Sequence, residues 1–206
     1  MSTSSYLQLA DYRRRVAESY ARMRDSKLPP EVRWQHFRTD QDNLFKSHPQ
    51  TALTLEQVAD FTSLNYFPYN PAYRFILPVE ILTDQDIVTI DLHDDGPTRL
   101  KTFGRIGFEI SGQEVYLTLF WLMGYGGGIF LPFKDLTSGT ETYAGGRYLI
   151  DTIKGADLGW EDDRLVIDFN FAYNPSCAYN ALWHCPLPPA ENHLPVAIPV
   201  GEMRFE

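Results

Sequence analysis

The sequence predicts a mainly β protein, α+β overall, in which an antiparallel β-barrel or sandwich of about eight strands follows two to three N-terminal helices. Near the N-terminus apolar residues recur every three or four positions, whereas after Tyr66 they alternate with polar residues. The 206 residues include 44% hydrophobic and 22% charged residues, which is ordinary for a soluble globular protein. A chain of this length can bury a core without disulfides or metal ions.

Helices are expected in the first sixty residues. One apolar stripe covers residues 6–27 with helical spacing. A second helix is expected to begin at Pro30, a favourable first-turn residue, and to end before His48. Thr54 and Gln57 have the spacing of a capping box and indicate a third, short helix.

Strands are expected wherever the period changes to two. Residues 88–93, 106–110 and 164–171 alternate between apolar and polar side chains. Turn-forming residues separate these runs, for example at Asp94-Asp95-Gly96-Pro97. These features predict an antiparallel arrangement rather than strands that alternate with helices.

One uncharged segment, residues 115–133, is about as long as a membrane-spanning helix. Glycines at 124 and 126–128 interrupt it, and they predict a β-hairpin with a turn at these positions. The glycines are not expected to bind phosphate, because no Lys-Ser/Thr pair and no helical pattern follow them.

Charge and the N-terminus restrict the partners and the compartment. The net charge is −9, divided into +3 over residues 1–50 and −12 over residues 51–206. An acidic body repels phosphate backbones, so nucleic acid is not expected as a partner. The polar N-terminus offers no export signal, so we expect a cytoplasmic protein that binds no membrane. A homodimer is left open.

The chain is expected to divide at about residue 50. Residues 1–50 would form a helical extension that packs on the body, and residues 51–206 would form an antiparallel β domain. Residues 183–199 contain five prolines and are expected to lie as an extended strap over the sheet.

Polar and aromatic side chains are most concentrated between Phe133 and Cys185, and they predict a small-molecule pocket. If residues 164–171 form one strand, Asp168 and Asn170 point to the same face. The predicted catalytic residues are Asp135 and Asp168, and the predicted ligand-binding residues are Tyr143, Arg147, Tyr148, Asn170, Tyr173 and Asn174.

Each residue type in this set suggests a role. Tyrosines would form walls, Arg147 and Asn174 would orient a carboxylate or carbonyl, and Asp135 or Asp168 would act as acid or base. The chemistry would be hydrolysis or proton transfer, because no redox-cofactor motif is present and no cofactor is expected. The alternative is structural, since buried Asp and Arg residues often pair to hold loops.

Two other functions remain open. Cys177, His184, Cys185 and His193 could hold zinc, although their spacing lacks the paired ligands of compact sites. The basic N-terminal helices could instead dock a protein partner, which would make the protein a non-catalytic interaction module.

Three motifs resemble those of a prokaryotic family known as domain of unknown function 1684. They lie at residues 131–149, 168–179 and 185–202, and the block at residues 34–49 is similar to the family's N-terminal segment. The resemblance implies no activity, substrate or cofactor. It implies that twelve polar positions are characteristic of the family: Asp135, Thr142, Tyr143, Arg147, Asp168, Asn170, Tyr173, Asn174, Cys177, Cys185, Asn192 and Glu202.

Overall fold

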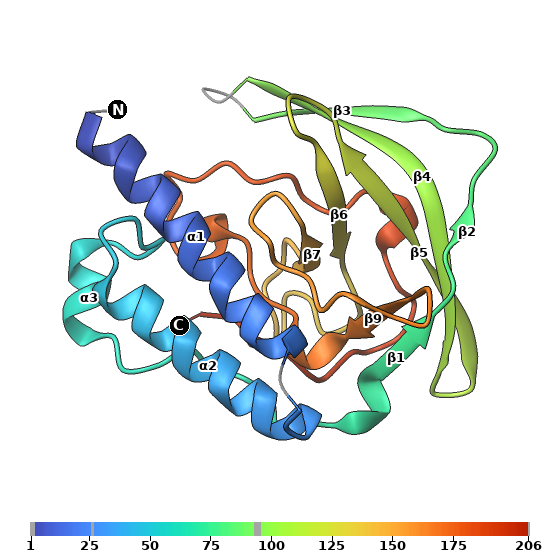
Figure 1. Ribbon diagram of the computed structural model, residues 1–206, viewed down its shortest axis with the longest axis horizontal. Coiled ribbons are helices and arrows are strands. Elements are labelled where there is room, and N and C mark those ends of the chain that lie inside the picture. Colours follow the sequence, from blue (N-terminus) through green and yellow to red (C-terminus); the bar gives the residue numbers. More distant parts are fainter. Residues whose placement is uncertain (1–2, 26, 93–95, 206) are drawn as a thin grey trace.

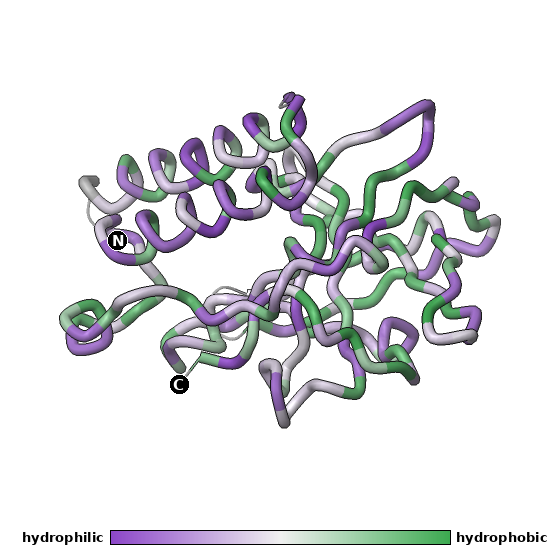
Figure 2. The backbone as a smooth tube through the Cα atoms, turned by 90° about the horizontal axis from the view of Figure 1, so that it is seen from below, coloured by the Kyte–Doolittle hydropathy of each residue, from purple (hydrophilic) through white to green (hydrophobic). Residues whose placement is uncertain are grey.

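The computed structural model describes residues 3–25, 27–92 and 96–205. Three helices precede the sheets, as predicted. They are α1 (Thr3–Asp25), α2 (Pro30–Ser47) and α3 (Leu55–Asp60). Figure 1 shows α1 and α2 side by side and antiparallel, and Figure 2 shows that they form a layer beside the strands. The turn expected at Asp94-Asp95 lies outside the described residues.

The helix ends confirm the predicted signals. Pro30 occupies the first turn of α2. An N–H at this position would have no partner within the helix, so proline loses no hydrogen bond there. At α3, the Gln57 N–H donates to Thr54 Oγ1 at 3.2 Å, and the Thr54 N–H donates to Gln57 Oε1 at 2.7 Å. This capping box satisfies two donors that the short helix cannot pair internally.

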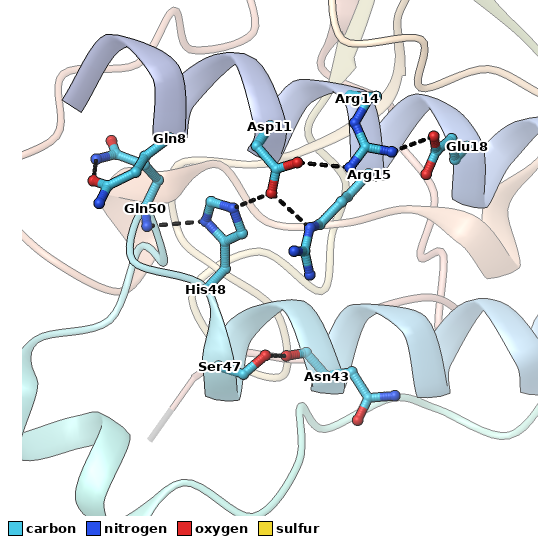
Figure 3. Close-up of polar contacts among 9 residues, drawn as sticks. All are labelled: Gln8, Asp11, Arg14, Arg15, Glu18, Asn43, Ser47, His48 and Gln50. Carbon is cyan, nitrogen blue, oxygen red and sulfur yellow. Dashed lines mark hydrogen bonds and ion pairs between the residues drawn. The ribbon is translucent and has the colours of Figure 1, made fainter. Parts of the chain in front are cut away.

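A buried histidine connects α1 to the end of α2 (Figure 3). His48 Nε2 lies 3.2 Å from the carboxylate of Asp11, and the Gln50 N–H donates to His48 Nδ1 at 3.0 Å. Since Nδ1 accepts, Nε2 carries the hydrogen that is shared with Asp11. Hydrogen bonds from Arg14 first, and then from His48, lower the pKa of Asp11 to about 2. The contact fixes the crossing of the two helices.

The strands form two antiparallel sheets. One has the order β1-β9-β8, and the other has the order β2-β4-β5-β6-β7 with β3 paired to β4. The strands are β1 (Arg74–Leu77), β2 (Glu80–Ile81), β3 (Ile87–Asp91), β4 (Pro97–Ile110), β5 (Gln113–Leu122), β6 (Gly128–Phe133), β7 (Arg147–Asp151), β8 (Trp160–Glu161) and β9 (Arg164–Asp168). Short 3-10 turns cover Pro71–Tyr73, Phe169–Phe171, Ser176–Ala178 and Ala190–Asn192.

The predicted α+β class and the antiparallel strands are confirmed, whereas the pairings of the described strands show no closed barrel. The uncharged segment forms the predicted hairpin, in which β5 and β6 pair. Gly126 and Gly127 lie in its turn at φ of +88° and +53°, a region that other residues rarely adopt. No helix in the described part of the chain is long and apolar enough to cross a membrane.

The strand predicted over residues 164–171 is too long. β9 ends at Asp168, and residues 169–171 form a 3-10 turn. The Asp168 carboxylate accepts a hydrogen bond from the Asn170 N–H at 3.0 Å, so it caps this turn. Asp168 and Asn170 therefore do not line one face of a strand.

Two hydrophobic cores are relevant to the site. The main core lies between the sheets and includes the buried C-terminal side chains Leu194, Val196 and Ile198, so this part of the expected strap is packed. A second core joins α1 and α2 to Phe171 and Ala156 of the body. The division near residue 50 stays a prediction.

Candidate functional site

A cavity of about 420 Å³ lies between the helices and the larger sheet. Such volumes are within the range of small-molecule sites. Its walls come from α1, α2, the strands β5 to β7 and the segment 173–186, and Glu202 also lines it. It therefore lies where the helical layer meets the strands.

Four buried polar atoms in the wall of this cavity have no hydrogen-bond partner within the described protein. They are Tyr20 Oη, Asp151 Oδ1, Tyr173 Oη and Asn174 Oδ1. Nine such side-chain atoms occur in the described residues, so nearly half of them belong to this one cavity. A buried polar group without a partner costs about 1–3 kcal/mol, so their concentration requires an explanation. We call these four residues the cavity cluster.

The neighbouring carboxyl group of Glu202 is satisfied by the protein. It is 2% exposed and accepts hydrogen bonds from the Tyr179 hydroxyl and from the Asn174 N–H, the latter at 2.9 Å. Burial raises the pKa of Glu202 to about 7, although these hydrogen bonds oppose the shift. The group can therefore gain or lose a proton near neutral pH.

Aromatic side chains form much of the remaining wall. The rings of Tyr148 and Tyr173 lie 5.8 Å apart at 83°, and those of Phe130 and Tyr148 lie 4.8 Å apart at 80°. The backbones of Tyr148 and Tyr173 also exchange two hydrogen bonds, of 2.9 and 3.1 Å. These bonds fix the backbones of Tyr148 and Tyr173 relative to each other.

Three of the predicted ligand-binding residues line this cavity: Tyr148, Tyr173 and Asn174. The Tyr148 hydroxyl donates to the carbonyl of Pro186 at 2.7 Å, which ties β7 to the proline-rich segment. The amide of Asn174 donates to the carbonyl of Met203 at 2.8 Å, which orients its own Oδ1 as an acceptor. The structure therefore brings these three side chains together.

Arg147 and Asp135 lie elsewhere, in a second buried polar group. Arg147 Nη2 donates to Asp135 Oδ2 and to the Ile198 carbonyl, both at 2.9 Å, and Nη1 donates to the Val200 carbonyl. Asp135 Oδ1 accepts from the N–H and the hydroxyl of Thr137. Only Arg147 Nε has no partner within the described protein. We call Arg147, Asp135 and Thr137 the arginine cluster, and none of its members lines the 420 Å³ cavity.

Asp168 and Asn170 are a third group. Asn170 donates from Nδ2 to Asp168 Oδ1 at 2.7 Å and to the Asn70 carbonyl at 2.9 Å. Burial raises the pKa of Asp168 to about 6. Asp168 lines a smaller cavity of about 260 Å³, together with Arg33 and Arg74. The two carboxylates predicted as catalytic therefore belong to different places in the fold.

Tyr143 lies beside the two cysteines. Its hydroxyl donates to Cys177 Sγ at 3.6 Å, and both thiols are free. Hydrogen bonds from Cys185 and Tyr143 lower the pKa of Cys177 to about 6, and the Cys177 thiolate in turn raises the pKa of Cys185. The Cys177, His184, Cys185 and His193 set is not assembled as a metal site: the described residues contain no group of three or more His, Cys, Asp or Glu side chains that could hold an ion.

The sequence pattern did not single out Tyr20, Asp151 or Glu202 as site residues. Tyr20 belongs to the apolar stripe of α1 and looks like an ordinary core residue. Asp151 lies at the end of β7, the strand that begins with Arg147. Glu202 is 54 residues distant from Tyr148, so only the fold brings Glu202 to the cavity. Two signals were available: Asp151 lies in the polar and aromatic region between Phe133 and Cys185, and Glu202 lies in the third family-like motif.

Comparisons with known proteins find a family and a solved structure whose functions are both uncharacterised. Residues 59–203 match the family described as protein of unknown function (DUF1684). The block at residues 34–49 lies outside this match. The chain is also similar to the solution NMR structure of the uncharacterized protein from gene locus rrnAC0354 of Haloarcula marismortui. The identity is 33%, the match covers 84% of this chain and 93% of that chain, and the TM-score is 0.59. No curated protein matches.

Proposed function

The chain belongs to the DUF1684 family of proteins of unknown function, and we propose that it binds a small organic molecule in the 420 Å³ cavity. The observation that carries this proposal is the cavity cluster. Tyr20, Asp151 and Asn174 are each at least 95% buried, and each has an unpaired polar atom and lines the same cavity. A ligand with matching polar groups would satisfy them, and its apolar part would contact the aromatic wall.

In this proposal the arginine cluster stabilises the fold. Arg147 is fully buried and holds three consecutive parts of the C-terminal segment through their carbonyls. That segment includes Glu202, which lines the cavity. Arg147 would therefore affect binding through the position of Glu202 and not through contact with the ligand.

The test is a ligand-observed NMR screen of a fragment library against the full chain and against Leu9→Trp. Leu9 lies on α1 at the cavity and is partly exposed, so a larger ring there should obstruct part of the cavity. We expect fragments that bind the natural chain and lose their signal in the variant. Equal signals in both proteins, with equal melting temperatures, would contradict the proposal.

A second candidate function, acid–base chemistry on the bound molecule, is favoured by Glu202. Its pKa of about 7 suits a group that exchanges protons near neutral pH. We expect Glu202→Gln to abolish turnover of chromogenic esters while fragments still bind. Turnover that is unchanged in this variant would contradict a hydrolytic role for Glu202.

A further inference from the structure

We propose that the ligand of the 420 Å³ cavity is an organic ammonium ion, a protonated amine that carries an apolar or aromatic body. This inference rests on the proposed function and specifies its ligand class. It follows from three independent properties of the wall: its hydrogen-bonding inventory, its charge and its aromatic geometry.

The inventory of unpaired atoms favours a donor. Asp151 Oδ1 and Asn174 Oδ1 can only accept hydrogen bonds, because the carboxylate carries no proton when ionised and the Asn174 amide already donates to Met203. The hydroxyls of Tyr20 and Tyr173 can accept as well as donate. These atoms therefore match a ligand that offers N–H groups better than a carboxylate or phosphate, which would face two acceptors.

The charge of the wall changes from its rim to its interior. The cationic side chains are at the exposed side: Arg13 is exposed, and Lys154, with 38% of its side chain exposed, pairs with Asp151 Oδ2 at 2.8 Å. The carboxyl groups of Asp151 and Glu202 lie deeper, with 5% and 2% exposure. His184 also lines the cavity. Arg13 and Lys154 equal the two acidic groups in number, but they lie at the exposed side of the cavity, so a cation placed deeper would lie closer to the buried carboxyl groups.

The titration of the tyrosines agrees with an acidic interior. Burial is the main cause of the raised pKa values of Tyr20 and Tyr173, and the nearby carboxylates add to it. Burial disfavours a charge of either sign, so only the smaller contribution of the carboxylates favours a cation here.

The aromatic geometry suits a cation as well. A ring attracts a cation that lies over its face within about 6 Å of the centroid. Tyr148 and Tyr173 are held at 83° to each other, so they form two sides of a corner rather than a flat stack. Tyr12, Tyr20 and Tyr179 line the same cavity. Proteins recognise quaternary ammonium groups with cages of aromatic side chains.

The test compares three indole probes of similar size that differ in charge. Tryptamine is a cation, 3-propylindole is neutral and indole-3-propionate is an anion. Calorimetric titration of the full chain at about pH 8, above the pKa of about 7 of Glu202 and with the amine still protonated, should show tryptamine binding at least about ten-fold more tightly than either of the others. Equal or tighter binding of the neutral or anionic probe, or no binding of tryptamine, would overturn the inference.

Variants separate charge from shape. We expect Asp151→Asn and Glu202→Gln each to reduce the preference for tryptamine over 3-propylindole by about five-fold or more, because each removes one buried negative charge. Glu109→Gln, at an exposed position of β4, is the matched control and should leave the preference unchanged. A preference that neither cavity variant alters would overturn the inference, and melting temperatures verify that each variant is folded.

The failure of this inference is distinguishable from the failure of the proposed function. If neutral or anionic fragments bind and Leu9→Trp abolishes their binding, the cavity is a ligand site and only the ammonium class is wrong. If no fragment binds in a manner that depends on Leu9, both proposals are wrong.

Discussion

Two buried polar groups in this protein are built from the same kinds of side chain but differ in how fully they are paired. In the arginine cluster, both oxygens of Asp135 and both terminal nitrogens of Arg147 bind protein atoms. In the cavity cluster, four polar atoms bind none within the described chain. A paired group can be explained by folding alone, whereas an unpaired group beside a cavity is better explained by binding.

The largest expected difference is in stability. Arg147→Met leaves the Asp135 carboxylate buried with fewer partners, which typically costs about 3–5 kcal/mol. We expect urea denaturation to show a loss of this size, while Tyr20→Phe in the cavity cluster changes the free energy of unfolding by less than about 1 kcal/mol. A stable Arg147→Met protein would show that the arginine cluster does not maintain the fold.

Glu202 connects the two groups, because its carbonyl accepts from Arg147 and its side chain lines the cavity. The dependence of stability on pH tests the protonation of its carboxyl group. Its pKa is about 7 in the folded chain and about 4.5 when the side chain is free in water, so the folded chain binds the proton more tightly. Its contribution to stability is therefore fully present below about pH 4.5 and is lost as the pH rises through 7. The shift corresponds to on the order of 3 kcal/mol.

Urea denaturation at about pH 4.5 and pH 8 checks this expectation in the natural chain and in Glu202→Gln. Asp168, whose pKa is raised to about 6, contributes in the same direction in both proteins and therefore cancels. The natural chain should lose more stability between the two pH values than the variant does. Parallel losses in the two proteins would mean that Glu202 is ionised as easily in the folded as in the unfolded chain.

A matched pair of tyrosines sharpens the comparison. The Tyr179 hydroxyl donates to Glu202, whereas the Tyr173 hydroxyl has no partner in the described protein. Tyr179→Phe should cost about 1–3 kcal/mol because it leaves a buried carboxyl oxygen unpaired. Tyr173→Phe should leave the free energy of unfolding unchanged within about 0.5 kcal/mol but weaken fragment binding. If the two variants are equally destabilised, Tyr173 has a partner inside the protein.

The smallest expected effect concerns the thiols. Cys177 has a pKa of about 6, and Cys185, whose pKa is raised, lines the cavity. At neutral pH iodoacetamide should therefore label Cys177 first, because the thiolate is the nucleophile. A bound fragment should slow the labelling of Cys185 more than that of Cys177. Peptide mapping by mass spectrometry measures both rates, and faster labelling of Cys185 would contradict the assignment.

The local patterns were sufficient to predict much of the fold. Period and caps predicted three helices, the hairpin of β5 and β6, and an antiparallel α+β class. The strand at residues 164–171 was predicted too long, because a side chain that caps a 3-10 turn at Asp168 leaves the alternating pattern of the sequence unchanged.

The site could be predicted only in part, for a physical reason. Tyr148, Tyr173 and Asn174 all belong to the region between Phe133 and Cys185 that was predicted to form a pocket, and they line the cavity. Tyr20 and Glu202 come from opposite ends of the chain, and no local pattern distinguishes a hydroxyl in a core from a hydroxyl in a cavity wall. The roles predicted for Asp135, Asp168, Tyr143, Arg147 and Asn170 remain predictions, and the contacts of Arg147 and Asn170 favour structural ones.

An electron-density map of the cavity, from crystals of the full chain grown with tryptamine, tests the central claim most directly. We predict an organic molecule whose amine lies within about 3.2 Å of Asp151 Oδ1 or Asn174 Oδ1, with its ring against Tyr148 or Tyr173. Ordered water alone at all four atoms of the cavity cluster, or side chains rearranged so that these atoms pair with each other, would contradict the claim that the cavity is a ligand site.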